Sequence, residues 1–351
     1  MSTVLPPQPT SPGVGIRRKG PKSHPSLPLS AFTPPNSGTS ERFPLPPSPS
    51  TVHPEKVLDA SVALLSSDDD LSQWKVHAGQ TLGIRIGGLV AALPTVDADI
   101  ARVISRLAAD KSKTSIISVM VPFQLDAPPE ELLTTAVLHN SPIPVSLATT
   151  FNAKATPQNV STLKWALEQG RPVDIDVQAD LKEDVFDTLE DLLYKATVNL
   201  EKVPPIILSN LLPPPHQLEL PIVKLMNHTS YRKFQAQVAA LSLHPQVYIK
   251  YLAPSWEAAP TVPGDSTPSL ESNENRKQKE WKRRIKMYLG PVMEAFGYQR
   301  IIYGSFPSKI SKTKISAGEW YELARESLAE LGVEQDVVDA VFYATALEVY
   351  S

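Results

Sequence analysis

The chain has 351 residues, with 35 prolines, 15 glycines and no cysteine. The absence of cysteine excludes a disulfide framework, a thiolate zinc site and a cysteine nucleophile. The net charge of −3, from 34 Lys and Arg against 37 Asp and Glu, gives no general attraction to nucleic acid or to an anionic membrane. We therefore expect neither of these as a partner.

The first 55 residues differ from the rest, because they hold 14 of the 35 prolines. Proline removes a backbone donor, and these residues include few that can form a core. We predict a disordered or extended proline-rich tail over residues 1–55. Short proline-rich segments are bound by domains that recognise the polyproline II conformation, so we expect protein partners to bind through this tail.

After the tail, a pattern of a short apolar run followed by a helical period repeats along the chain. The runs predict eight strands, over residues 57–64, 84–93, 114–123, 143–151, 172–180, 204–210, 246–253 and 300–306. Helical patterns follow them, most clearly over residues 97–111, 128–140, 157–170 and 182–200. Residues 254–275 are rich in proline and serine and predict a flexible insertion before the last strand.

Eight strand–helix units predict a (β/α)₈ TIM-type barrel over residues 56–351, in the α/β class. An open doubly wound sheet is the alternative, but no strand is followed by a glycine-rich phosphate turn. Functional residues of a (β/α)₈ barrel lie at the carboxyl ends of its strands. We therefore expect the site residues at those strand ends.

The sequence gives only weak indications of the compartment in which the protein resides. The first residues lack the pattern of a secretory signal, and no apolar run is long enough to span a membrane. We expect an intracellular protein, cytoplasmic or nuclear or both. Two basic runs, 17–22 and 276–284, are suited to nuclear import. The second also fits the solvated face of an amphipathic helix, because Trp281, Ile285 and Leu289 recur every four residues.

Two strands place charged residues where a lumen would be. Asp174 and Asp176 alternate with apolar residues, as does Lys250, and helices cover the outside of a barrel. These three side chains, with Asp59 as a further candidate, should face inward. One interpretation is a polar pocket that binds a ligand or performs acid–base chemistry. The other is a buried network in which Lys250 neutralises the aspartates, since an unpaired buried charge is costly.

Several segments together resemble the metal-dependent amidohydrolase superfamily, in its branch of amidohydrolase-related hydrolases and decarboxylases. They are "VLDASVAL", "PPIILSN", "HPQVYIKYLA", "FGYQRIIYGSFP" and the ending "ELARESLAELGVEQDVVDAVFYATALEVY", and the resemblance spans residues 57–351. It implies a (β/α)₈ barrel that holds a metal on strand-end histidines and an aspartate.

The resemblance also implies where those ligands would lie. The first-strand histidines correspond to Ser61 and Ala63, the sixth-strand histidine to Asn210, and the eighth-strand aspartate to Phe306. Serine and an amide are poor ligands for a transition metal, and alanine and phenylalanine are none. We therefore expect no metal and no other cofactor. We also expect Phe306 to plug the barrel mouth.

A second, fainter resemblance covers residues 27–60, "LPLSAFTPPNSGTSERFPLPPSPSTVHPEKVLDA", which is similar to the start of the clampless-type proteins of mushroom-forming fungi. It implies a developmental role in sexual development, through clamp cell formation. The sequence thus favours a non-catalytic barrel that acts as a binding or regulatory protein. The alternative is a metal-independent hydrolase or decarboxylase that uses Asp174, Asp176 and Lys250 at the barrel mouth.

Overall fold

The computed structural model describes most of the chain from residue 48 onward. The described residues are 48–64, 71–94, 100–109, 114–127, 138, 140–152, 154–178, 185–214, 222–254, 273–306 and 315–351. Residues 1–47 of the predicted tail, nearly all of the predicted helix 128–140, and residues 255–272 of the predicted insertion lie outside them. The last three residues of that insertion are helical, because the helix α7 already begins at Asn273.

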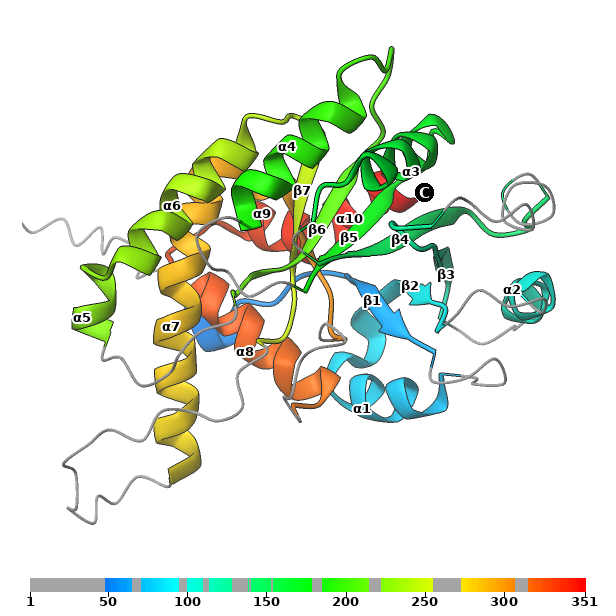
Figure 1. Cartoon of the computed structure of the whole chain (residues 1–351). Helices are drawn as coiled ribbons and strands as arrows, with labels where there is room; N and C mark the ends of the chain where they lie inside the picture. Colours follow the sequence, from blue (N-terminus) through cyan, green and yellow to red (C-terminus); the bar gives the residue numbers. More distant parts are fainter. Residues whose placement is uncertain are drawn as a thin grey trace, which may run out of the picture. The chain divides into compact units, whose positions relative to one another are not determined.

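Eight parallel strands follow one another in chain order around a barrel (Figure 1). They are β1 Val57–Ala63, β2 Ile86–Ala92, β3 Ile116–Pro122, β4 Val145–Phe151, β5 Val173–Val177, β6 Ile206–Leu212, β7 Val247–Tyr251 and β8 Ile301–Tyr303. After β8, the Phe306 amide donates to the Ser61 carbonyl at 2.8 Å, which links the last strand's end to the first strand. The predicted (β/α)₈ TIM-type barrel is confirmed.

Helices surround the strands, and neighbouring helices contact one another in the pairs α3–α4, α4–α6, α6–α7, α7–α8 and α1–α8 (Figure 1). The α-helices are α1 Ser72–Leu82, α2 Ile100–Ala109, α3 Pro157–Glu168, α4 Val185–Thr197, α5 Ile222–Met226, α6 Thr229–Ser242, α7 Asn273–Phe296, α8 Ala317–Ala329, α9 Gln335–Asp339 and α10 Thr345–Tyr350. Short 3₁₀ turns occupy Pro49–Thr51, Gly83–Arg85 and Tyr298–Arg300, and a π-helical turn occupies Ala340–Ala344. No helix in the described part of the chain combines the length and apolarity needed to cross a membrane.

The amino-terminal end of the barrel is closed by the chain's own last helix. Ala346, Val349 and Tyr350 of α10 pack into one apolar cluster with lumen-facing residues of five strands, which are Leu58, Ala60, Val90, Met120, Ile207 and Ile302. The preceding π-helical turn places Tyr343 against Gly87, near the start of β2, where a Cβ atom would lie 2.5 Å from the tyrosine ring. Among the described residues, side chains fill this end of the lumen, so a ligand would enter from the opposite end.

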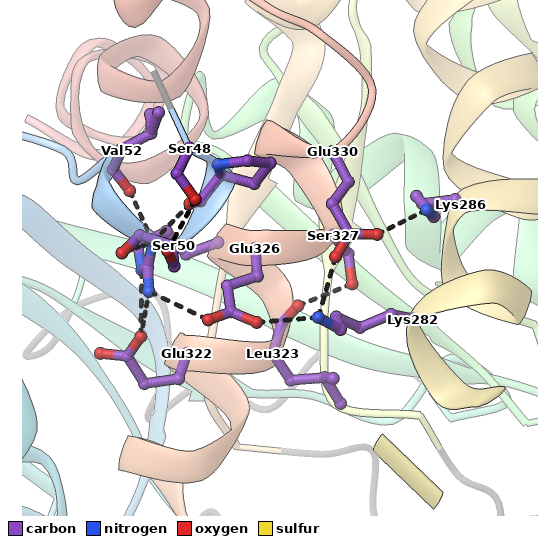
Figure 2. A network of polar contacts seen from close by, with 12 residues as sticks. Ser48, Ser50, Val52, Lys282, Lys286, Glu322, Leu323, Glu326, Ser327 and Glu330 are labelled. Atoms are coloured by element: carbon purple, nitrogen blue, oxygen red, sulfur yellow. Dashed lines mark hydrogen bonds and ion pairs between the residues drawn. The ribbon is translucent and has the colours of Figure 1, made fainter. Parts of the chain in front are cut away.

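The segment that carries Ser48, Ser50 and Val52 lies beside α8 (Figure 2). The buried Arg325 of α8 holds it there. Its Nη1 donates to the carbonyl oxygens of Pro49 at 3.0 Å, Ser50 at 3.3 Å and Val52 at 2.7 Å. The other guanidinium nitrogens donate to the Glu322 carboxylate. Residues 48–55 belong to the predicted tail, but the backbone carbonyls of Pro49, Ser50 and Val52 find their partner on α8.

The basic run 276–284 lies on α7, and the helix is amphipathic as one of its two interpretations predicts. Ile285 and Leu289 are fully buried in the main core. Arg284, however, is also buried and donates to Glu280 at 3.0 Å, so it does not lie on a solvated face. Lys282 reaches α8, where it bonds two glutamates at 2.8 and 3.0 Å (Figure 2).

Gly304 allows the end of β8 to lie against β1. A Cβ atom at this residue would lie 2.8 Å from Cβ of Ser61 and 2.9 Å from Cδ2 of Leu252. We expect Gly304→Ala to lower the free energy of unfolding by about 1–3 kcal/mol, because overpacking forces the neighbours to shift. Gly290→Ala on α7 is the matched control, since a Cβ there would meet no atom within 4 Å. Urea unfolding of both variants checks this, and equal stability of the two would contradict it.

Candidate functional site

A cavity of about 300 Å³ opens at the carboxyl ends of the strands. Most of its wall is apolar, and polar side chains gather at a few points. The lining residues are Ser61, Ala63, Leu64, Ala92, Leu93, Pro94, Met120, Ala148, Thr149, Asp174, Asp176, Ser209, Lys250, Leu252 and Phe306. We call this space the mouth cavity. It lies where (β/α)₈ barrels place their functional residues.

The floor of the mouth cavity is a buried ion pair between Lys250 of β7 and Asp174 of β5. Alternation along the two strands turns both side chains into the lumen, as the sequence predicts. Tyr350 of α10 reaches the same carboxylate from below, and its hydroxyl donates to Oδ1 at 3.0 Å and Oδ2 at 2.9 Å. Nζ of Lys250 also lies 5.5 Å from the centroid of the Tyr350 ring, as a cation–π contact. The helix that closes one end of the barrel thus supports the cavity floor at the other.

The titration of these groups follows from their burial. Burial raises the pKa of the Asp174 carboxyl, while the Lys250 ammonium and the Tyr350 hydroxyl favour its charged form and oppose that rise. Burial, and then the Asp174 charge, raise the pKa of the Tyr350 phenol well above its ordinary value. The phenol therefore remains protonated at neutral pH and acts as a hydrogen-bond donor.

Asp176 also lines the mouth cavity. It lies two residues beyond Asp174 on β5, and it is half-buried. Its Oδ2 accepts a hydrogen bond from Nε2 of Gln178 at 2.8 Å. The structure thus brings all three sequence candidates, Asp174, Asp176 and Lys250, to one cavity. Asp174 and Lys250 form a buried ion pair, which is the contact that the network interpretation describes.

Ser61, Ala63 and Phe306 line the mouth cavity at its β1–β8 side. The Ser61 hydroxyl donates to the Phe306 carbonyl at 3.3 Å. The expectation that Phe306 plugs the mouth is wrong, because its side chain is 37% exposed at the edge of a cavity that stays open. Its backbone pairs with β1, and this pairing fixes the ring at the rim.

Asn210 does not line the mouth cavity. Its backbone adopts a positive φ of 66°, a conformation that asparagine tolerates better than most residues. Its amide donates to the Val177 carbonyl at 2.7 Å, between the ends of β6 and β5. The preceding residue, Ser209, lines the cavity instead, and sequence reasoning missed it. The signal was present, since Ser209 is in phase with the lumen-facing Ile207.

Asp59 faces outward, so the expectation that it points into the lumen is wrong. It is fully buried and accepts hydrogen bonds from Nε1 of Trp74 on α1 at 2.8 Å and from the backbone of Ser305 at 2.8 Å. A register shift in β1 after Asp59 reverses the alternation, so Ser61 points inward although Asp59 does not. Burial raises the pKa of Asp59, and these hydrogen bonds oppose that rise.

No protein-family model matches the chain, and no curated protein matches it. Among solved structures, an amidohydrolase from Burkholderia multivorans with bound HEPES is similar at a TM-score of 0.57 and 15% identity, over 84% of this chain and 99% of the other. An amidohydrolase from the same organism with bound zinc gives 0.56 and 15%, over 84% and 99%.

A third similar structure is the "Putative 2-Pyrone-4,6-Dicarboxylic Acid Hydrolase" from Pseudomonas putida, with a TM-score of 0.51 and 16% identity over 84% of this chain and 97% of the other. The chain shares the (β/α)₈ barrel fold of these structures. This agrees with the fold that the strand-end motifs imply. At this level of identity the likeness concerns the fold alone.

That fold raises the question of a metal, and the side chains at the implied positions do not suit one. The Ser61 hydroxyl and the Asn210 amide both donate to backbone carbonyls, Ala63 has no donor atom, and Phe306 presents a phenyl ring. Within the described ranges, no three His, Asp or Glu side chains gather where they could hold a metal ion. A catalytic zinc requires about three protein ligands.

Proposed function

We propose that this chain is a non-catalytic, amidohydrolase-fold barrel that binds a small molecule in the mouth cavity and acts as a regulatory protein. The observation that carries this is the cavity itself. It is open and mainly apolar, and its deepest charges, Lys250 and Asp174, already satisfy each other. Apolar walls with a few fixed polar groups are typical of ligand sites.

The arrangement favours binding over hydrolysis. A general base must be free to accept a proton, but Asp174 accepts hydrogen bonds from Lys250 and from Tyr350 at once. The positions that carry metal ligands in the resembled superfamily hold Ser61, Ala63, Asn210 and Phe306. The proposal therefore assigns the barrel no metal and no other cofactor.

A second candidate is a metal-independent hydrolase or decarboxylase. The specific observation in its favour is that Asp176 lines the same cavity as Lys250, so an acid and a base could flank one ligand. This candidate requires turnover that falls when Asp176 is replaced by asparagine. The binding proposal requires saturable binding without turnover.

The biological setting of the proposal comes from the proline-rich tail and the first residues of the barrel. We place the protein inside the cell, in the cytoplasm or the nucleus, with protein partners that bind its proline-rich tail. The resemblance of residues 27–60 to clampless-type proteins supports a role in fungal sexual development. In this proposal, the protein partners bind the chain when a small molecule occupies its mouth cavity.

Methyl NMR of the full chain tests the binding proposal directly. Met120 lines the mouth cavity and is one of only five methionines, so a protein labelled with ¹³C-methyl methionine carries a reporter inside the site. We expect α-methylstyrene, an uncharged hydrocarbon probe, to shift the Met120 signal saturably in protein treated with a chelator. The change Ala63→Phe, which fills the mouth, should abolish the shift.

Met120→Leu assigns the reporter signal and completes the controls. The absence of any saturable shift, or a shift that appears only after zinc is added, would overturn the proposal. Stoichiometric zinc, nickel or manganese that survives chelation, measured by elemental analysis, would overturn it as well.

A further inference from the structure

The ammonium of Lys250 is buried and can donate a further hydrogen bond. Its side chain is 2% exposed, and it lines the mouth cavity. Of its three N–H groups, one is taken by Oδ1 of Asp174 and one points to Sδ of Met120 at 3.8 Å. A thioether is a weak acceptor. Among the described residues no other acceptor contacts Nζ, so at least one strong hydrogen bond remains to be made at the cavity floor.

The charge on Lys250 is already balanced. Asp174 supplies the counter-charge, and Tyr350 completes the carboxylate's hydrogen bonds. A ligand therefore needs to bring an acceptor atom and not a negative charge. A carboxylate placed here would also stand beside the two aspartates that line the cavity, and like charges at such distances are unfavourable.

The rest of the site sets the size and polarity of the ligand. About 300 Å³ is at the small end of the range for ligand pockets. The wall above the floor is largely hydrocarbon, from Leu64, Leu93, Pro94, Ala148, Leu252 and Phe306. Ser209 adds one hydroxyl, which has no hydrogen-bond partner within the part of the chain that the structure describes.

The geometry points to a specific class of ligand: a small, largely apolar molecule with one uncharged carbonyl oxygen, which accepts a hydrogen bond from Nζ of Lys250. This inference rests on the proposed binding function and adds the chemistry of the ligand to it. Lys250 is the specificity-determining residue, and Asp174 and Tyr350 are the positioning residues that hold it. The apolar body of the ligand occupies the space between Leu93 and Phe306.

Two probes of nearly the same shape test the inference. Acetophenone carries a carbonyl oxygen where α-methylstyrene carries a methylene group, so they differ in the acceptor alone. Both are titrated into the full chain with the Met120 methyl signal as the readout. The double variant Lys250→Met/Asp174→Leu removes both charges together, so it leaves no unpaired ion in the barrel.

We expect the preference for acetophenone over α-methylstyrene to fall at least about tenfold in the double variant, since a hydrogen bond from a charged donor is worth about 1.5–3 kcal/mol. If α-methylstyrene binds and the ratio of the two dissociation constants is the same in both proteins, the inference is overturned while the proposed function stands. If neither probe binds the unaltered chain, the proposed function fails and the inference fails with it.

A second measurement needs no variant and covers the case in which the double variant does not fold. A hydrogen bond to a carbonyl oxygen polarises the C=O bond and moves the carbonyl carbon resonance downfield. Acetophenone labelled with ¹³C at its carbonyl should show this downfield shift when bound, relative to its position in an apolar solvent. A bound resonance at the apolar-solvent position would contradict the inference.

Discussion

Replacing Lys250 with methionine alone should lower the free energy of unfolding by about 3–5 kcal/mol, because it leaves the Asp174 carboxylate buried without its counter-charge. Replacing both partners, as Lys250→Met/Asp174→Leu, should restore most of that loss. Buried ion pairs are often no more stabilising than apolar side chains of similar volume. Urea unfolding of the single and double variants measures both effects.

The free energy of unfolding that the Lys250→Met variant loses should also depend on pH, and the loss should grow as the pH rises. Burial raises the pKa of Asp174 and the Lys250 ammonium opposes the rise, so removing Lys250 raises this pKa further. A carboxyl whose folded-state pKa lies above its unfolded value favours folding only while it is protonated. The deficit relative to the unaltered chain should therefore be smallest near pH 4 and grow as the pH rises. If Lys250→Met lowers the free energy of unfolding by less than about 1 kcal/mol at pH 7, the prediction that the Lys250–Asp174 pair is needed to stabilise the cavity floor is wrong.

Replacing Arg325 with methionine should release residues 48–53 from α8 and cost about 2–3 kcal/mol. The buried guanidinium donates to three backbone carbonyls of this segment, and hydrogen bonds from charged groups are among the stronger ones. Hydrogen exchange should rise in residues 48–53 and in α8. The cost stays moderate because carbonyls that detach at the surface regain water.

Arg283→Met on α7 is the matched control for Arg325. The Arg283 side chain is 68% exposed, and its ion pair with Glu280 spans 4.0 Å. Exposed pairs of this kind contribute about 0–1 kcal/mol, so this variant should unfold almost as the unaltered chain does. Unchanged exchange of residues 48–53 in Arg325→Met would mean that other contacts, such as that of His53 with Tyr321, hold the segment.

The architecture could be predicted because it is encoded locally. Each strand is a short apolar run bounded by turn residues, and alternation along β5 and β7 placed Asp174 and Lys250 in the lumen. The errors arise where alternation breaks. A register shift in β1 turned Asp59 outward, and the left-handed backbone of Asn210 ended the alternation in β6 after Ser209. No local pattern announces either irregularity.

The support of the site by Tyr350 could not be predicted for a different reason. Nothing in the sequence around Tyr350 distinguishes it from any aromatic residue of an amphipathic helix. Its role depends on α10 entering the barrel from below and reaching a strand that lies 176 residues earlier in the chain. Contacts of that separation are set by topology alone.

The docking of residues 48–55 against α8 and α9 has a consequence for how the chain folds. Arg325 and Asp339 bind this segment across 276 and 284 residues of sequence. Contacts so distant form late, because the loop must close before they contribute. At a synthesis rate of about 5–20 residues per second, α8 and α9 are made roughly 15–60 s after β1. Over that time its free edge is the part of the nascent barrel most exposed to pairing with another chain.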